Sequence, residues 1–130
     1  MLLICEVAVK GLLPSIRAVL AEELTQRHNL KQTEAARILG ISQPAISLYL
    51  KKLRGKAVNL EQDMEIKKLI AALADLLAEK HLSNKEFITK FCEICRIARA
   101  KGLLCGMHST LDPNYAPENC QLCMTETPSC

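Results

Sequence analysis

The sequence predicts an all-α fold, a helical bundle with one long helix and a cysteine-rich segment at its C-terminal end. Its 130 residues are 49% hydrophobic but only 3% aromatic, a balance that suits aliphatic packing between helices. Apolar residues recur at helical spacing through most of the chain. Ser, Pro and Gly stand where helices would begin and end, and a break around Gly55 and Asn59 divides the chain into residues 1–57 and 58–130.

The first part of the chain predicts two consecutive helices. Residues 1–13 are apolar with interspersed charges and are interpreted as a short helix, although their Val-Ala-Val run would also suit a strand. Pro14 suits the first turn of a second helix that runs to about His28. The expected core-facing residues of this helix are Ile16, Val19, Leu20 and Leu24. Arg17 and Arg27 lie off this stripe and are interpreted as solvated charges or phosphate contacts.

The apolar opening segment is too short to span a membrane and lacks the basic n-region of a signal peptide. We therefore expect a cytoplasmic protein with no membrane partner. In a cytosolic protein, seven cysteines indicate metal or redox chemistry rather than a disulfide framework. Cys5, alone in this apolar segment, is expected to be a core residue.

Two short helices are predicted next, separated by a sharp turn. In the first, near residues 31–39, small and apolar side chains share one face. Gly40 can adopt φ > 0 after the last turn, so the chain can reverse direction there. Ser42 suits the N-cap of the second helix, near residues 43–53, and Pro44 is tolerated in its first turn. This helix is expected to bury Ile46, Tyr49 and Leu50 and to expose Gln43, Pro44, Ser47, Leu48 and Lys51.

This pair of helices resembles the helix-turn-helix of phage repressors and their relatives, the XRE or Cro-repressor type. The matching positions are the small Ala36, the turn residue Gly40, the apolar Ile41 after it, and Ile46 in the second helix. Lys31 departs from the pattern, because the family usually caps the first helix with Ser or Thr. The resemblance implies a protein that binds double-stranded DNA and is not an enzyme.

Gln32 and Gln43 look like the glutamines that open the two helices in several such repressors, where the first tends to touch a phosphate and the second a base. The expected DNA-binding residues are Gln32, Ser42, Gln43, Pro44, Ser47, Lys51, Lys52 and Arg54. Residues 1–56 carry nine Lys/Arg against four Asp/Glu, whereas residues 57–130 carry eight against ten. A basic first half suits DNA, because phosphate neutralisation supplies much of the affinity.

The second half predicts a long helix from Asn59 to about Lys80 and a further helix over residues 83–101. The long helix has an apolar stripe that includes Ile66, Leu69, Leu73 and Leu76. This stripe either packs on the first half or joins two subunits. We expect a homodimer through it, since helix-turn-helix proteins usually bind paired half-sites. Ser83 and Glu86 form a capping box that opens the last helix.

Beyond Gly102 the chain is rich in Gly and Pro and is expected to lack long regular structure. The predicted metal ligands are two C-x2-C pairs, Cys92, Cys95, Cys120 and Cys123. Two such pairs indicate a thiolate-bound metal, which would hold this segment against the last helix. Cys105 is the alternative ligand, His108 is expected at the surface, and Cys130 is expected to be dispensable.

Two cofactors suit these cysteines. Zn²⁺ takes four thiolates in a tetrahedral site, whereas a [4Fe–4S] cluster also takes four but accepts more irregular spacing. The helical, apolar surroundings of the first pair favour the iron–sulfur cluster. As a whole the chain resembles small predicted archaeal regulators that join a repressor-type helix-turn-helix to a cysteine-rich tail.

We therefore expect a transcription regulator whose cluster senses redox state, oxygen or iron. One alternative is a DNA-binding regulator with a purely structural zinc site. The other is a thiol redox enzyme, which a thioredoxin-like βαβ pattern would indicate, and the sequence has no such pattern.

Overall fold

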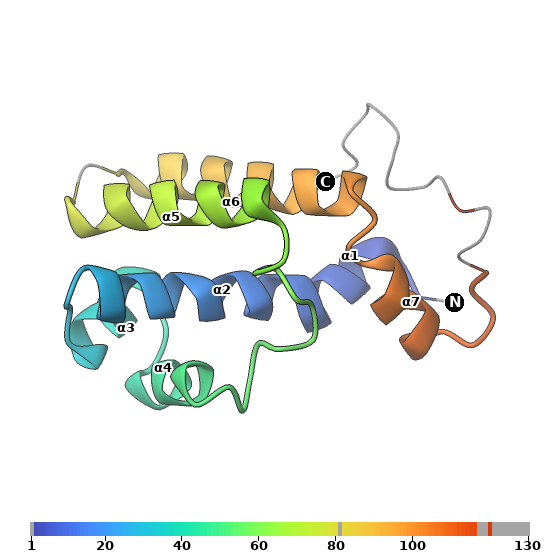
Figure 1. Ribbon diagram of the computed structural model, residues 1–130, viewed down its shortest axis with the longest axis horizontal. Coiled ribbons are helices and arrows are strands. Elements are labelled where there is room, and N and C mark those ends of the chain that lie inside the picture. Colours follow the sequence, from blue (N-terminus) through green and yellow to red (C-terminus); the bar gives the residue numbers. More distant parts are fainter. Residues whose placement is uncertain (1, 81, 117–119, 121–130) are drawn as a thin grey trace.

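The computed structural model describes residues 2–80, 82–116 and 120, and the regular structure in this part of the chain is helical throughout. The all-α prediction is confirmed. The N-terminal part forms one long helix that crosses the molecule (Figure 1). It consists of α1 (Ile4–Val7), η1 (Ala8–Leu12), α2 (Leu13–Glu22) and η2 (Glu23–Arg27), in which η1 and η2 are turns of π-helix.

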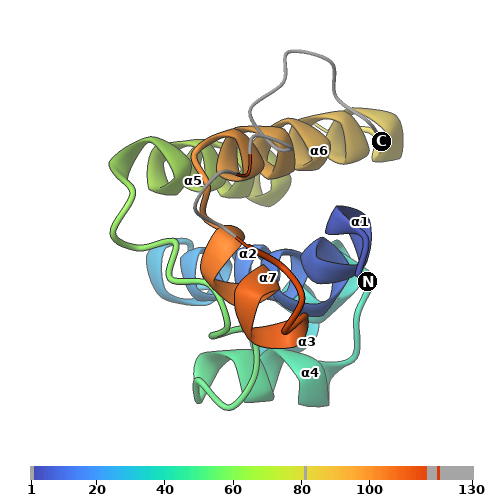
Figure 2. The same cartoon turned by 90° about the vertical axis from the view of Figure 1, so that its right-hand side faces the viewer.

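The other helices pack around this long helix. On one side α5 (Met64–Ala78) and α6 (Asn84–Ala100) lie next to each other (Figures 1 and 2). On the other side α3 (Gln32–Leu39) is followed by α4 (Gln43–Leu50), which packs on α2. A short helix, α7 (Cys105–Leu111), lies against α1 at one end of the molecule. Among the described residues, none of these helices is both long and apolar enough to cross a bilayer.

The continuity of the first helix differs from the prediction, because Pro14 does not open a separate helix. Backbone angles stay helical across the junction, with φ −71° and ψ −49° at Leu12 and φ −60° and ψ −47° at Leu13. The N–H of Leu13 donates to the carbonyl of Ala8, five residues earlier. This wider π-helical turn leaves room for a proline ring, which in a regular α-helix would clash with the carbonyl four residues before it. Cys5 is exposed on this helix, so its predicted core position was wrong.

The hydrophobic core surrounds the long helix, and its most deeply buried side chains include those between this helix and α5. Leu20 and Leu24 are fully buried, as are Ile66 and Ile70 of α5, and Leu73 is 2% exposed. One continuous cluster of buried residues includes both sides of the predicted boundary at residue 57. Ile66 and Leu73 of the α5 stripe therefore pack within one chain and have no surface left to offer a partner, whereas Leu69 and Leu76 are half-buried.

Local hydrogen bonds explain the starts of α6 and α5, and a change of backbone conformation follows the end of α4. The N–H of Glu86 donates to Ser83 Oγ over 3.2 Å and the N–H of Ser83 donates to the Glu86 carboxylate over 2.8 Å, which confirms the predicted capping box. α5 begins later than predicted, at Met64, because the Asp63 carboxylate caps it by accepting from the N–H of Ile66 over 3.1 Å. α4 ends earlier than predicted, at Leu50, and Lys52 follows with φ 57°.

α7 was not expected, and it is held in place by contacts with the start of the chain. The thioether of Met107 in α7 occupies the space beside Gly11 that a side chain would fill, so α7 packs directly against the backbone of the long helix there. The N–H of Leu2 donates to the Asp112 carboxylate over 3.0 Å, just after α7 ends. Because these contacts join segments far apart in the sequence, helical spacing alone could not reveal them.

A pH dependence of stability follows from the Asp112 contact. The N–H groups of Leu2 and Asn114 donate to this carboxylate and hold its pKa below the ordinary value of 3.8. Bonds with neighbouring groups also lower the pKa of Asp63, Asp75 and Glu86. A carboxyl with a depressed folded pKa contributes stability above its unfolded pKa and loses it as the pH falls through the folded pKa.

We therefore expect the free energy of unfolding to be steady above about pH 5 and to decrease below about pH 4. Urea denaturation between pH 3 and 7 measures it. Asp112→Asn is expected to make the decrease below about pH 4 shallower. The same slope in both proteins would show that the Asp112 contact does not contribute to acid stability.

Candidate nucleic-acid interface

The turn between α3 and α4 has the geometry that its residues predict. Gly40 adopts φ 67°, and the N–H of Ile41 donates to the carbonyl of Ala36 over 3.0 Å, which closes α3. Ser42 Oγ accepts from the N–H of Ala45 over 3.2 Å and so caps α4. Pro44 lies in the first turn of α4, where its missing N–H would have no helical partner. The local sequence therefore determines where the second helix begins.

α4 has one buried face and one exposed face, as predicted. Ile46 is fully buried and Tyr49 is 5% exposed, because α4 packs on α2 and α3. On the other face Gln43, Pro44, Leu48 and Lys51 are exposed and Ser47 is half-buried. An accessible helix face with Gln43 at its start is thus available to a partner.

The two glutamines expected at the interface contact each other. Gln43 Nε2 donates to Gln32 Oε1 over 2.7 Å, between residues eleven positions apart in the chain. Both side chains are exposed to solvent, so burial is not the cause of this contact. The hydrogen bond orients the Gln43 amide and leaves its oxygen and one N–H free to bind another group.

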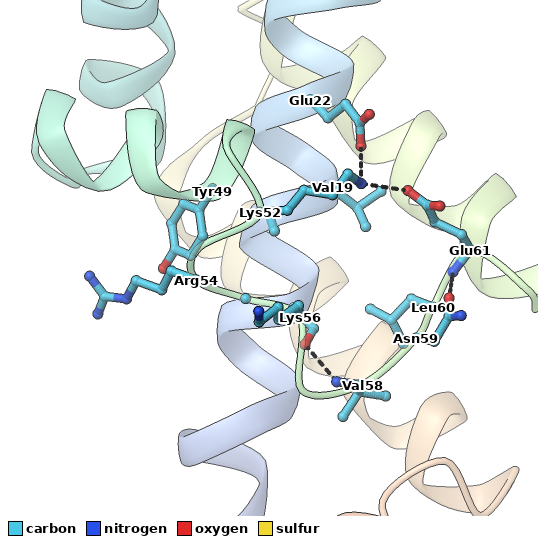
Figure 3. A pocket seen from close by; sticks show the side chains of 13 residues that line it. Val19, Glu22, Tyr49, Lys52, Arg54, Lys56, Val58, Asn59, Leu60 and Glu61 are labelled. Carbon is cyan, nitrogen blue, oxygen red and sulfur yellow. Dashed lines mark hydrogen bonds and ion pairs between the residues drawn. The ribbon is translucent and has the colours of Figure 1, made fainter.

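The predicted cations do not all point the same way. Lys51 is exposed at the end of α4. Lys52 Nζ lies 3.5 Å from Glu61 Oε1 and 4.0 Å from Glu22 Oε2, in a pocket of about 240 Å³ between α2 and the segment after α4 (Figure 3). The guanidinium of Arg54 lies over the Tyr49 ring, 5.5 Å from its centre. Lys52 is therefore directed towards two carboxylates and is not grouped with Lys51.

The two arginines of the long helix also have structural partners. The Arg17 guanidinium lies over the Phe91 ring of α6, 5.9 Å from its centre. Arg27 pairs with Glu23 and Asp75, and its Nη2 donates to the carbonyl of Ala71 over 3.0 Å. Because both guanidinium groups join the long helix to α5 or α6, on the side away from α4, they are not part of the candidate interface.

The cysteines of the described part do not assemble into a metal site. Cys92 is exposed and Cys95 is half-buried on α6, and Cys105 and Cys120 are half-buried elsewhere. Within the described residues, no three His, Cys, Asp or Glu side chains are placed to hold a metal ion. The predicted ligand Cys123 lies outside the described residues, as does Cys130. The described thiols alone do not supply the four ligands that either cofactor needs.

The structure places His108 of α7 against Tyr115. Hydrogen bonding with Cys120, burial and hydrogen bonding with Cys105 raise the pKa of Tyr115 well above its usual range. The Tyr115 ring stacks on His108 at 3.8 Å between ring centres. His108 is 7% exposed, so its predicted surface position was wrong. The sequence analysis expected no helix at His108 and did not single out Tyr115, so this contact was not foreseen.

Comparison with protein-family models, with curated proteins and with solved structures finds no match for this chain. What is established is an all-helical fold with an exposed polar helix face that begins at Gln43.

Proposed function

We propose that the chain is a DNA-binding transcription regulator, in which α3, the turn and α4 form a helix-turn-helix and α4 enters the major groove. The observation that carries this proposal is the hydrogen bond of 2.7 Å from Gln43 to Gln32. It fixes the first exposed side chain of α4 in one orientation, and side chains at the start of a recognition helix are those that contact base edges.

The donors and acceptors of Gln43 suit adenine. A glutamine amide has two N–H donors and one acceptor oxygen, and one N–H is already used by Gln32. The remaining N–H and oxygen match the N7 acceptor and the N6 donor that adenine presents in the major groove. The B-DNA major groove is wide enough to admit an α-helix. An exposed, pre-oriented Gln43 would therefore read one A·T pair.

Phosphate contacts would come from the exposed cations near this face. Lys31 precedes α3 and Lys51 follows α4, and both are exposed. Lys52 is a weaker candidate than the sequence suggests, because Glu22 and Glu61 compete with a phosphate for its ammonium group. The excess of Lys and Arg in residues 1–56 supports the same assignment.

Substitution of Gln43 tests the proposed readout. On a site selected from random-sequence DNA, Gln43→Ala is expected to cost about 1–3 kcal/mol and to relax the preference at one base pair. Gln32→Ala is expected to act in the same direction, because Gln43 loses its orienting partner. The double variant should lose less binding free energy than the sum of the losses in the two single variants, since both substitutions act through the same amide. Binding titrations measure all four proteins.

Lysine variants separate readout from phosphate contact. Lys51→Ala is expected to weaken all DNA sequences alike and to lower the salt slope by about 1. Lys68→Ala is the control, because Lys68 is exposed on α5, in the layer on the other side of the long helix. If Gln43→Ala and Lys51→Ala reduced specific and non-specific binding equally, α4 would not be the reading helix.

We also propose that the regulator is a homodimer, because paired half-sites are the usual targets of such domains. Its interface would lie outside the buried stripe of α5. Light scattering of the purified chain at micromolar concentration tests this proposal. A chain that is monomeric both alone and when bound to its selected DNA site would contradict it.

The cofactor stays a proposal that rests on cysteine spacing, with [4Fe–4S] first and Zn²⁺ as the alternative. The described thiols alone do not form either site, so the proposal depends on residues beyond residue 120. The iron, sulfide and zinc contents of anaerobically purified protein test this proposal. Stoichiometric iron and sulfide would support a sensor, one zinc would support a structural site, and neither metal would reject both.

A further inference from the structure

α4 is closed by a lysine in a backbone conformation that lysine seldom adopts. Lys52 has φ 57°, in the left-handed region. Its N–H donates to the carbonyl of Tyr49 over 3.1 Å, and the N–H of Leu53 donates to the carbonyl of Leu48 over 3.0 Å. These two bonds form the Schellman motif that ends many helices, in which glycine is the usual left-handed residue. Lysine is strained at this position, because its Cβ atom crowds the carbonyl oxygen that follows it.

This helix end determines where the Lys52 side chain points. Lys52 is four positions after Leu48, so one more turn of α4 would place both on the exposed face of the helix. The left-handed backbone directs Lys52 into the pocket between α2 and the segment after α4 instead (Figure 3). There Nζ lies 3.5 Å from Glu61 Oε1 and 4.0 Å from Glu22 Oε2. One ammonium group faces two carboxylates, so the trio attracts a phosphate less than a single lysine would.

Both carboxylates belong to elements outside the pair α3 and α4. Glu22 is the last residue of α2. The N–H of Glu61 donates to Asn59 Oδ1 over 3.1 Å, just before α5 begins. The start of α5 is also tied to the end of α6, because Lys101 Nζ donates to the Asp63 carboxylate over 3.1 Å. One of the two acids that face Lys52 is therefore presented by the layer of α5 and α6.

We propose that Glu22 and Glu61 form an autoinhibitory contact, which holds Lys52 away from DNA when α4 lies in the major groove. This inference rests on the proposed DNA binding and adds a restraint on its strength. Exposed ion pairs are weak, because solvent screens them, so the restraint can be relieved. Without the two carboxylate charges, the ammonium group would be free to bind a phosphate beside the end of α4.

Neutralisation of both acids tests the contact. The full-length chain with Glu22→Gln and Glu61→Gln should bind its selected duplex about eightfold more tightly than wild type at 0.1 M salt. One added phosphate contact steepens the dependence of the logarithm of the binding constant on the logarithm of the salt concentration by about 0.9, so the gain should fade towards about 1 M salt. Fluorescence anisotropy titrations at several salt concentrations measure both quantities.

Lys52→Gln separates release of the lysine from a general loss of negative charge. Alone it should change the affinity little, because the acids already hold Lys52 in the wild-type chain. Combined with the two acid substitutions it should cancel their gain. Glu79→Gln with Glu93→Gln is the matched control, since it removes the same charge from exposed positions in the layer of α5 and α6 and should give no comparable gain.

Three results would contradict the autoinhibitory contact. The first is a wild-type affinity and salt slope in the protein with both acids neutralised, on a duplex that it binds. The second is a gain that persists after Lys52→Gln, which would show that the acids repel DNA directly. The third is a salt slope lowered by about 1 by Lys52→Gln alone, which would mean that Lys52 already binds a phosphate. If none of these proteins bound any duplex, the proposed function would be rejected as well.

Discussion

Leu73→Glu is expected to unfold the protein rather than to separate two subunits. Leu73 is 2% exposed and lies in the core between α5 and the long helix. Loss of a buried leucine side chain alone costs about 2–5 kcal/mol, and a buried carboxylate without a partner adds to that cost. We therefore expect a decrease in melting temperature of about 10 °C or more, or no folded protein at all. Circular dichroism during heating measures it.

Ala72→Glu is the matched control, because Ala72 precedes Leu73 on α5 and is exposed. It adds the same charge to the same helix and should change the melting temperature little. If Leu73→Glu instead kept the wild-type melting temperature and converted a dimer into a monomer, the α5 stripe would be a subunit interface after all, and the packing described above would be wrong.

Gly55→Ala is expected to have the second-largest effect. Gly55 has φ 73°, which already disfavours alanine, and a Cβ atom there would lie 2.6 Å from the backbone oxygen of Pro14 and 2.8 Å from Ala18 Cβ. Left-handed backbone costs an alanine about 1–2 kcal/mol and overpacking about 1–3 kcal/mol. The variant should therefore lose about 3 kcal/mol of unfolding free energy, measured by urea denaturation.

Gly40→Ala separates the two causes. Gly40 also has a positive φ, 67°, but no atom lies within 4 Å of a Cβ built there. It should lose only the backbone contribution, about 1 kcal/mol. Equal losses in the two variants would mean that the segment after α4 moves away from α2 at little cost.

Local interactions let the sequence alone determine the starts of α4 and α6 and the turn between α3 and α4. Ser83 with Glu86 and Ser42 with Ala45 satisfy backbone groups only three residues away, so they form wherever the rest of the chain lies. Gly40 ends α3 for a similarly local reason, since glycine tolerates a positive φ. The exposed face of α4 follows from the same helical spacing.

The tertiary structure decided which surfaces meet. The helical period of the sequence shows that α5 has an apolar stripe, which could be buried against another subunit or against the long helix of the same chain. In the structure it packs against the long helix. Lys52 is directed to Glu22 and Glu61 by contacts that its position in the sequence does not specify. The contact between Leu2 and Asp112 depends on how α7 packs on the start of the chain, because long-range contacts have no period that a sequence could display.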